Sequence, residues 1–114
     1  MEIKNVRPWG YYQVLSDRPD HKVKRIVVEP GGILSLQRHQ LRSEHWYALT
    51  GEGIAIIDGQ RHPLRTGMAV DIPQGATHRL ENTAGADLVI IEVQTGTYFG
   101  EDDIERLEDK YGRV

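Results

Sequence analysis

Four side chains in two separate stretches of the sequence are of the types that bind divalent metals. The first stretch contains Gln37, His39 and Glu44, and the second, further along the chain, contains His78. Together they offer one amide oxygen, one carboxylate and two imidazoles, which suit zinc, iron, manganese or cobalt. The residue types alone do not choose among these metals. The sequence therefore predicts one divalent-metal site assembled from both stretches.

The elements that must position these side chains are short β-strands. Twelve glycines and five prolines divide the chain into short segments, which favours an all-β sandwich or barrel. The strongest hairpin signal is Asp58-Gly59, because a two-residue type I′ turn requires positive φ at both positions. We expect strands at residues 11–15, 23–28, 34–39, 45–49, 53–57, 60–64, 69–72, 78–81 and 88–94.

Strand alternation predicts how the four ligands meet. Residues two apart on a strand share a face, so Gln37 and His39 should point the same way. Glu44 opens the next expected strand, and an antiparallel return would bring its carboxylate beside them. His78 follows a Pro-x-Gly turn that can aim the strand after it. Ligands from three strands would then gather at one end of a small barrel.

The pattern changes near the C-terminus. Ile104, Leu107 and Tyr111 recur at helical spacing, acids crowd the first turn, and Lys110 lies in the last turn. Acids at the start and a base at the end suit the helix dipole. We therefore expect a short C-terminal α-helix over residues 101–111.

Two of the expected strands are apolar on both faces, at residues 26–28 and 88–91. Such runs are typical of strands covered on both sides. A second subunit would supply the outer cover, so we expect a homodimer.

The composition narrows the class of protein further. With 114 residues the chain makes one compact domain, and with no cysteine it has neither a disulfide nor a thiolate metal site. The chain has 17 acidic and 14 basic residues. Residues 101–114 contain six of the acidic and three of the basic residues, so the rest of the chain has eleven of each and is neutral. No basic surface indicates nucleic acid and no apolar run approaches a membrane span. We expect a cytoplasmic domain without either partner.

The spacing of both stretches is similar to that of the two cupin motifs. The first stretch reads Gly31-x5-Gln37-x-His39-x4-Glu44-x6-Gly51, and the second reads Gly67-x5-Pro73-x-Gly75-x2-His78-x3-Asn82. Gln37 stands where most cupins have a histidine. Further motifs along nearly the whole chain narrow the resemblance to type II phosphomannose isomerase. They are Arg7-Pro-Trp-Gly10, Lys22-Val-Lys-Arg-Ile26, Leu34-Ser-Leu-Gln37, Arg42-x-Glu44-His45-Trp46, Leu80-Glu-Asn82, Ile91-Glu-Val-Gln94, Gly100-Glu-Asp-Asp103 and Tyr111-Gly-Arg113.

The resemblance implies a single cupin domain, a double-stranded β-helix that also occurs as the C-terminal part of bifunctional mannose-1-phosphate guanylyltransferase/mannose-6-phosphate isomerases. It implies interconversion of mannose 6-phosphate and fructose 6-phosphate through a cis-enediol, with one divalent metal ion. Zinc is expected first, with cobalt, manganese, nickel and iron as alternatives. The expected partner is therefore a small-molecule sugar phosphate.

The resemblance also implies roles for residues beyond the metal ligands. The base stays open among Glu92, His45 and a lysine of the 22–24 pair. Basic residues near Lys24 would hold the phosphate. The candidate catalytic residues are Glu92, Lys24, His45 and Arg42, and the candidate substrate-binding residues are Lys22, Arg25, Gln94 and Arg113.

One position departs from the family pattern Gln-x-His-x-His-Arg. Leu41 stands where the family has its second histidine. Alternation would place it on the face of His39, unless a turn before Glu44 breaks that parity. A second hypothesis therefore stays open, a non-catalytic or regulatory metal-binding cupin that binds a sugar or sugar phosphate. A third class, a metal-dependent dioxygenase of the same fold, more often uses a His-rich first motif, so Gln37 argues against it.

Overall fold

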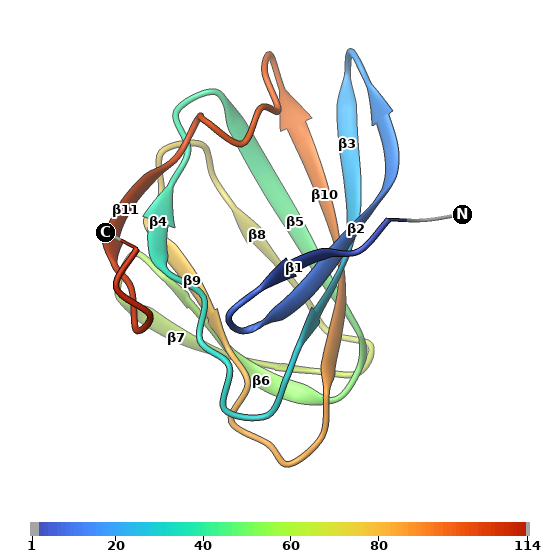
Figure 1. Cartoon of the computed structure of the whole chain (residues 1–114). Coiled ribbons are helices and arrows are strands. Elements are labelled where there is room, and N and C mark those ends of the chain that lie inside the picture. The colour runs from blue at the N-terminus through green and yellow to red at the C-terminus, as the bar shows by residue number, and fades with distance from the viewer. Residues whose placement is uncertain (1–2, 114) are drawn as a thin grey trace.

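Eleven β-strands in two antiparallel sheets make up the fold in the computed structural model, which describes residues 3–113 (Figure 1). No helix occurs in that range, so no helical segment there crosses a membrane. In chain order the strands are β1 (Asn5–Arg7), β2 (Gly10–Arg18), β3 (His21–Val28), β4 (Leu36–Arg38), β5 (Arg42–Thr50), β6 (Glu52–Ile57), β7 (Gln60–Arg65), β8 (Ala69–Ile72), β9 (His78–Glu81), β10 (Leu88–Gly96) and β11 (Glu105–Glu108).

The two sheets differ in size. The large sheet has the strand order β1-β2-β3-β10-β5-β8, and the small sheet has the order β11-β4-β9-β6-β7. All pairings in both sheets are antiparallel. Figure 1 shows the sheets facing each other, with the chain after β10 passing across one end of the barrel to reach β4. The all-β fold predicted from the sequence is therefore confirmed.

The interior between the sheets is apolar at one end and polar at the other. Along β10 the buried apolar Ile90 is followed, on the same face, by the buried Glu92. Along β5 the sequence runs the opposite way, from Glu44 to Ala48. Because β5 and β10 are antiparallel, Ile90 lies opposite Ala48 and Gln94 lies opposite Glu44. The register thus gathers the buried polar side chains at one end of the barrel.

The two-residue turn predicted at Asp58-Gly59 is present. It joins β6 to β7, and Asp58 and Gly59 have φ values of 48° and 80°. Both residues lie in the left-handed region, as a type I′ turn requires. Each of the nine expected strands has a counterpart, whereas β1 and β11 carry no clear strand pattern in the sequence.

The predicted C-terminal helix is wrong. Residues 105–108 form β11, which pairs with β4 so that Arg106 lies opposite Gln37. An isolated helix of this length is marginal in water, and the edge of β4 offers unpaired backbone groups. The carboxylate of Asp103 also accepts hydrogen bonds from the backbone N–H groups of Gln40 and Leu41, at 3.1 and 3.0 Å. Pairing with the barrel therefore overrides the local helical pattern.

The doubly apolar strands lie side by side in the large sheet. Val27 and Val89 are register partners that are 2% and 8% exposed. Tyr47 and Leu49 on nearby β5 keep 42% and 40% of their surface exposed. The homodimer remains a prediction.

Asn82 offers a test of how the turn before β10 is held. Its buried side-chain amide donates to the carbonyls of Val28 and Ala86, both at 2.8 Å, and its Oδ1 accepts from the N–H of Ala84 at 2.9 Å. We expect Asn82→Ala to lower the free energy of unfolding by about 2–3 kcal/mol, because buried backbone groups lose their partners. Urea denaturation would measure this, with exposed Thr83→Ala as the control. Equal stability of the two variants would contradict this role.

Candidate metal centre

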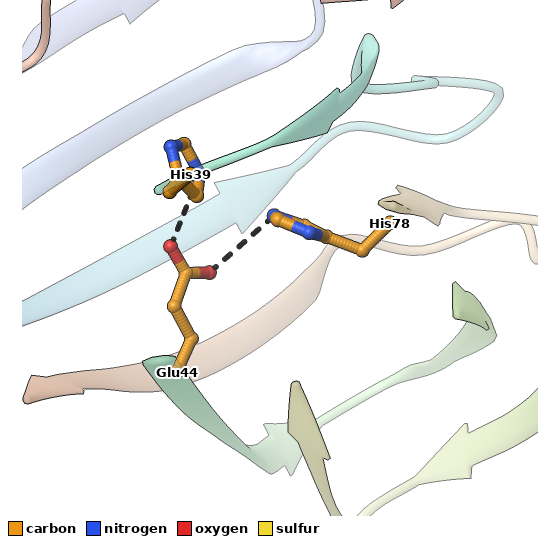
Figure 2. A group of neighbouring side chains, drawn as sticks. All are labelled: His39, Glu44 and His78. Carbon is orange, nitrogen blue, oxygen red and sulfur yellow. Dashed lines mark ion pairs between the residues drawn. The ribbon is translucent and has the colours of Figure 1, made fainter. Parts of the chain in front are cut away.

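Three buried side chains converge at the polar end of the barrel. Ligand atoms of His39, Glu44 and His78 all lie within 4.8 Å of one another. The Glu44 carboxylate lies 3.3 Å from Nε2 of His39 and 3.7 Å from Nε2 of His78. Figure 2 shows this carboxylate between the two imidazole rings. None of the three residues is more than 4% exposed, so the cluster is screened from solvent.

Backbone carbonyls orient both imidazoles. The Nδ1 atom of His39 donates to the carbonyl of Asp103 at 2.6 Å, and the Nδ1 atom of His78 donates to the carbonyl of Ala76 at 3.0 Å. A carbonyl only accepts, so each ring carries its proton on Nδ1. Each Nε2 lone pair is then turned toward Glu44. Metal-binding histidines are typically fixed in this way by a hydrogen bond from the other ring nitrogen.

Gln37 lies beside this cluster on the small sheet. It is the register partner of His78 across β4 and β9, so their side chains share a face. Its Nε2 donates to Oγ and to the backbone carbonyl of Ser35, at 3.0 and 3.3 Å. Both Gln37 and His78 line the same cavity. Gln37 therefore lies in the same wall of the cavity as His78.

Burial keeps both histidines neutral. Burial, helped by the charge of Arg42, lowers the pKa of His39 from 6.5 to about 4. Burial also lowers the pKa of His78. Metal ligands must be deprotonated before they bind, so neither imidazole has a proton to lose at pH 7. The donor set of two neutral imidazoles and a carboxylate fits a zinc-like divalent cation.

The guanidinium of Arg42 contacts two of the three residues in the cluster. Its Nε donates to Glu44 at 3.0 Å, and its Nη2 donates to Nε2 of His39 at 3.2 Å. Its Nη1 is buried and has no hydrogen-bond partner among the described residues. A metal ion that takes these ligand atoms requires the guanidinium to release them.

A second buried acid, Glu92, adjoins the cluster. Its carboxyl group accepts a hydrogen bond from Nε1 of Trp46 at 3.2 Å and another from Nε2 of Gln94. Nε1 of Trp46 also donates to Glu44, at 3.0 Å. Burial and the nearby charge of Glu44 raise the pKa of Glu92 from 4.5 to about 7. Glu92 is therefore poised to gain or lose a proton near neutral pH.

The chain after β10 adds a residue that the sequence did not single out. Glu101 lies 2.9 Å from Nζ of Lys24 and 3.8 Å from Nη1 of Arg42. Burial acts to raise the pKa of Glu101, but the charge of Lys24, its hydrogen bond and the charge of Arg42 outweigh this and lower it. Glu101 belongs to the Gly100-Glu-Asp-Asp103 motif. Because a helix was expected over this segment, the sequence did not place Glu101 at the site.

The structure brings most of the sequence-predicted site residues to one cavity. Its lining includes Gln37, His39, Glu44, His78, Glu92, Lys24, Arg42 and Arg113. Lys22 lies beyond it with its Nζ bonded to the carbonyl of Phe99 at 3.3 Å, and Gln94 is fully buried behind Glu92.

Three other positions face away from the cavity. The side chain of His45 is 47% exposed and bonds to Asp71 at 2.7 Å. Arg25 points to the other face of β3 and bonds to the hydroxyl of Tyr11 and the side chain of Gln13, each at 3.3 Å. Leu41 is 43% exposed, so it does not share the face of His39. The loop between β4 and β5 breaks the strand alternation on which that expectation depended.

Comparison with solved structures defines the class of fold. CapF, a capsular polysaccharide assembling protein from Staphylococcus aureus, superposes with a TM-score of 0.85 at 23% identity, covering 96% of this chain and 35% of CapF. KdgF from Halomonas gives a TM-score of 0.76 at 17% identity over 86% of each chain. A double-stranded β-helix protein from Klebsiella pneumoniae gives 0.75 at 17% identity, over 95% and 85% of the two chains. The domain therefore has the cupin double-stranded β-helix fold.

Sequence comparison then gives the family. The family described as "Mannose-6-phosphate isomerase C-terminal" matches residues 1–109, and the chain belongs to it. Mannose-1-phosphate guanylyltransferase from Klebsiella pneumoniae is 45% identical over 107 residues, 94% of this chain and 23% of that protein. The alginate biosynthesis protein AlgA from Pseudomonas aeruginosa is 47% identical over 108 residues, 95% of this chain and 22% of AlgA. The chain thus spans less than a quarter of the length of these curated relatives.

The metal site predicts a stabilisation by zinc that depends on its ligands. We expect zinc at about 100 times its dissociation constant to add about 2.7 kcal/mol to the free energy of unfolding, because only the folded state holds the ligands together. His39→Ala and Glu44→Gln should lose this effect, whereas His62→Ala, on β7 outside the cavity, should keep it. Thermal unfolding with and without zinc would measure it. An equal zinc effect in all four proteins would contradict the site.

Because the pKa of Glu92 is raised in the folded state, the stability of the metal-free protein should depend on pH. The pKa of Glu92 is higher in the folded state, about 7 instead of 4.5, so the folded state binds the proton more tightly than the unfolded state. Wild-type stability should therefore fall as pH rises from 4.5 to 7, by on the order of 3 kcal/mol. The Glu92→Gln variant carries no charge at this position. Its free energy of unfolding should therefore be higher than that of wild type at pH 8 and equal to it near pH 4.5.

Chelator-treated protein in urea would show this difference between the two pH values. Glu52→Gln, at an exposed position on β6, serves as the matched control. A stability gap between Glu92→Gln and wild type that is the same at both pH values would contradict a raised pKa for Glu92.

Proposed function

We propose that this domain is a metal-dependent isomerase that interconverts mannose 6-phosphate and fructose 6-phosphate. The observation that carries the proposal is the pairing of two features in one cavity. A three-ligand cluster lies beside a separate buried acid, Glu92, whose pKa is about 7. An isomerisation through a cis-enediol needs a positive charge that stabilises the substrate oxygens, which the metal ion would supply. It also needs a base that moves the proton between C2 and C1, which Glu92 would supply. Membership of the family supports the same reaction.

The proposed metal ion, zinc first among the candidates, would be held by His39, Glu44 and His78, with Gln37 as a further ligand. When bound, such an ion supplies positive charge that stabilises developing negative charge on substrate oxygens. The sugar phosphate as ligand and a cytoplasmic location are part of the same proposal.

Glu92 is the best-placed base among the three candidates from the sequence. It would take the proton from C2 of the sugar and return it at C1, while Trp46 Nε1 and Gln94 hold the carboxylate in one orientation. A base whose pKa lies near the working pH is the most effective for such a transfer. His45 faces solvent outside the cavity. Lys24 is held by Glu101 and lies 4.2 Å from the ring centroid of Tyr12.

The rival proposal is a cupin that binds a sugar phosphate without turnover. Its main support in the sequence is Leu41. Because Leu41 is 43% exposed and lies outside the cavity, its replacement of a histidine leaves the buried cluster as described. The position of Leu41 therefore weighs toward the catalytic reading.

A coupled assay that follows fructose 6-phosphate formation from mannose 6-phosphate would test the proposal. We expect turnover with zinc, cobalt or manganese and a fall in kcat of about 10²–10⁴-fold in Glu92→Gln, the range typical of a lost general base. Glu81→Gln makes the same chemical change on β9 outside the cavity and should leave kcat unchanged. No turnover with any metal, in folded and metal-loaded protein, would favour the rival.

Leu41→His distinguishes the two readings further. Because the position is exposed, we expect activity within about threefold of wild type, the scale of an ordinary surface substitution. A large gain in rate would show instead that Leu41 had disabled the site, contrary to its placement here.

A further inference from the structure

The cavity holds more positive than negative side chains. Most of its basic residues face an acid: Lys24 lies 2.9 Å from Glu101, Arg42 lies 3.0 Å from Glu44, Arg79 lies 2.6 Å from Glu108 and Arg113 lies 2.7 Å from Asp109. Arg7 and Arg106 also line the cavity. Within residues 3–113 neither of these two forms an ion pair. Two guanidinium charges in the wall are therefore left uncompensated.

Arg106 lies in register with the metal ligands. It is opposite Gln37 across β11 and β4, and Gln37 is opposite His78 across β4 and β9. Register partners share a face of the sheet, so the three side chains form a row on the inner face. The Nε atom of Arg106 is buried and has no hydrogen-bond partner among the described residues. Arg106 as a whole is half-buried, and its unpaired Nε leaves a donor free for a ligand in the cavity.

Arg7 reaches the same cavity from β1, at the edge of the large sheet. Its guanidinium lies 5.1 Å from the ring centroid of Tyr12, and its Nη2 donates to the Tyr12 hydroxyl at 3.3 Å. These contacts hold the guanidinium without neutralising it. Arginine is well suited to phosphate because its planar fork offers two parallel donors.

We propose that Arg7 and Arg106, which line the same cavity as Glu92, form the binding site for the phosphate group of the substrate. A phosphate monoester carries a charge of about −1.5 to −2 at pH 7, which matches the two uncompensated guanidinium charges. This site differs from the Lys22–Arg25 run that the sequence suggested, because Lys24 is engaged by Glu101 and Arg25 faces outward. The inference rests on the proposed function for the identity of the phosphate-bearing ligand, but the site itself is testable without turnover.

Calorimetric titration with inorganic phosphate tests the site. Metal-free protein is used, so that phosphate cannot bind through a metal ion. We expect Arg7→Gln and Arg106→Gln each to weaken phosphate binding about ten- to hundredfold, the scale of a lost charge-assisted hydrogen bond. Arg38→Gln is the matched control, because Arg38 belongs to the same strand pair but points outward and bonds to Glu105. Unchanged binding in Arg7→Gln and Arg106→Gln, or no phosphate binding to wild type, would overturn the inference.

Thermal unfolding in phosphate-free buffer separates binding from a structural role. Removing a cation that forms no ion pair should leave the Tm of Arg106→Gln equal to or above that of wild type, and phosphate should raise the Tm of wild type more than that of Arg106→Gln. A lower Tm without phosphate would assign Arg106 a structural role and overturn the inference. Arg106→Lys keeps the charge but loses the fork, and intermediate phosphate affinity is expected.

Kinetics make failure of this inference distinguishable from failure of the proposed function. Phosphate binding that depends on both arginines, without any isomerase turnover, would support the site and defeat the isomerase. Turnover of mannose 6-phosphate with an unchanged KM in both arginine variants would support the isomerase and defeat the site.

Discussion

Two carboxyl groups, Glu44 and Glu92, are buried side by side at the polar end of the barrel, and the surrounding charges follow from this. A buried carboxylate is costly unless it is paired or protonated. Glu44 is held by Arg42 and faces two neutral imidazoles, and the pKa of Glu92 rises to about 7. A divalent cation between the imidazoles and Glu44 would supply the remaining charge. In the proposed function, the metal ion would bind at Glu44 and the proton transfer would take place at Glu92.

Antiparallel register is what brings these groups together from distant parts of the chain. Glu92 lies opposite both Lys24 and Trp46, so one row across the large sheet carries a buried acid, a cation and an indole donor. The small sheet contributes the facing row of Arg106, Gln37 and His78. The site therefore lies between the two sheets, and the ligand candidate His39 directly follows the end of β4. Strands hold ligands more accurately than loops do, and His39 is fixed in addition by its hydrogen bond to the carbonyl of Asp103.

Much of this was predictable from period-two alternation and motif spacing. The shared face of Glu92 and Gln94, and the outward turn of Arg25, follow from counting along single strands. The exposed side of His45 also follows from counting along β5 from the buried Glu44. Leu41 shows where such counting fails, since a loop resets the parity between His39 and Glu44. The C-terminal segment was misread because long-range pairing with β4 overrides its helical pattern. As a result, Glu101 and Arg106 could not be assigned to the cavity from sequence alone.

Crystals grown with zinc and measured on both sides of the zinc absorption edge would test the central claim most directly. The account predicts one anomalous peak bound by Nε2 of His39, Nε2 of His78 and the carboxylate of Glu44, with Nδ1 of each ring still donating to its backbone carbonyl. Arg42 would no longer contact His39. The absence of a peak at these residues in crystals that bind zinc elsewhere would contradict the account, because the buried cluster would then be a structural ion-pair network.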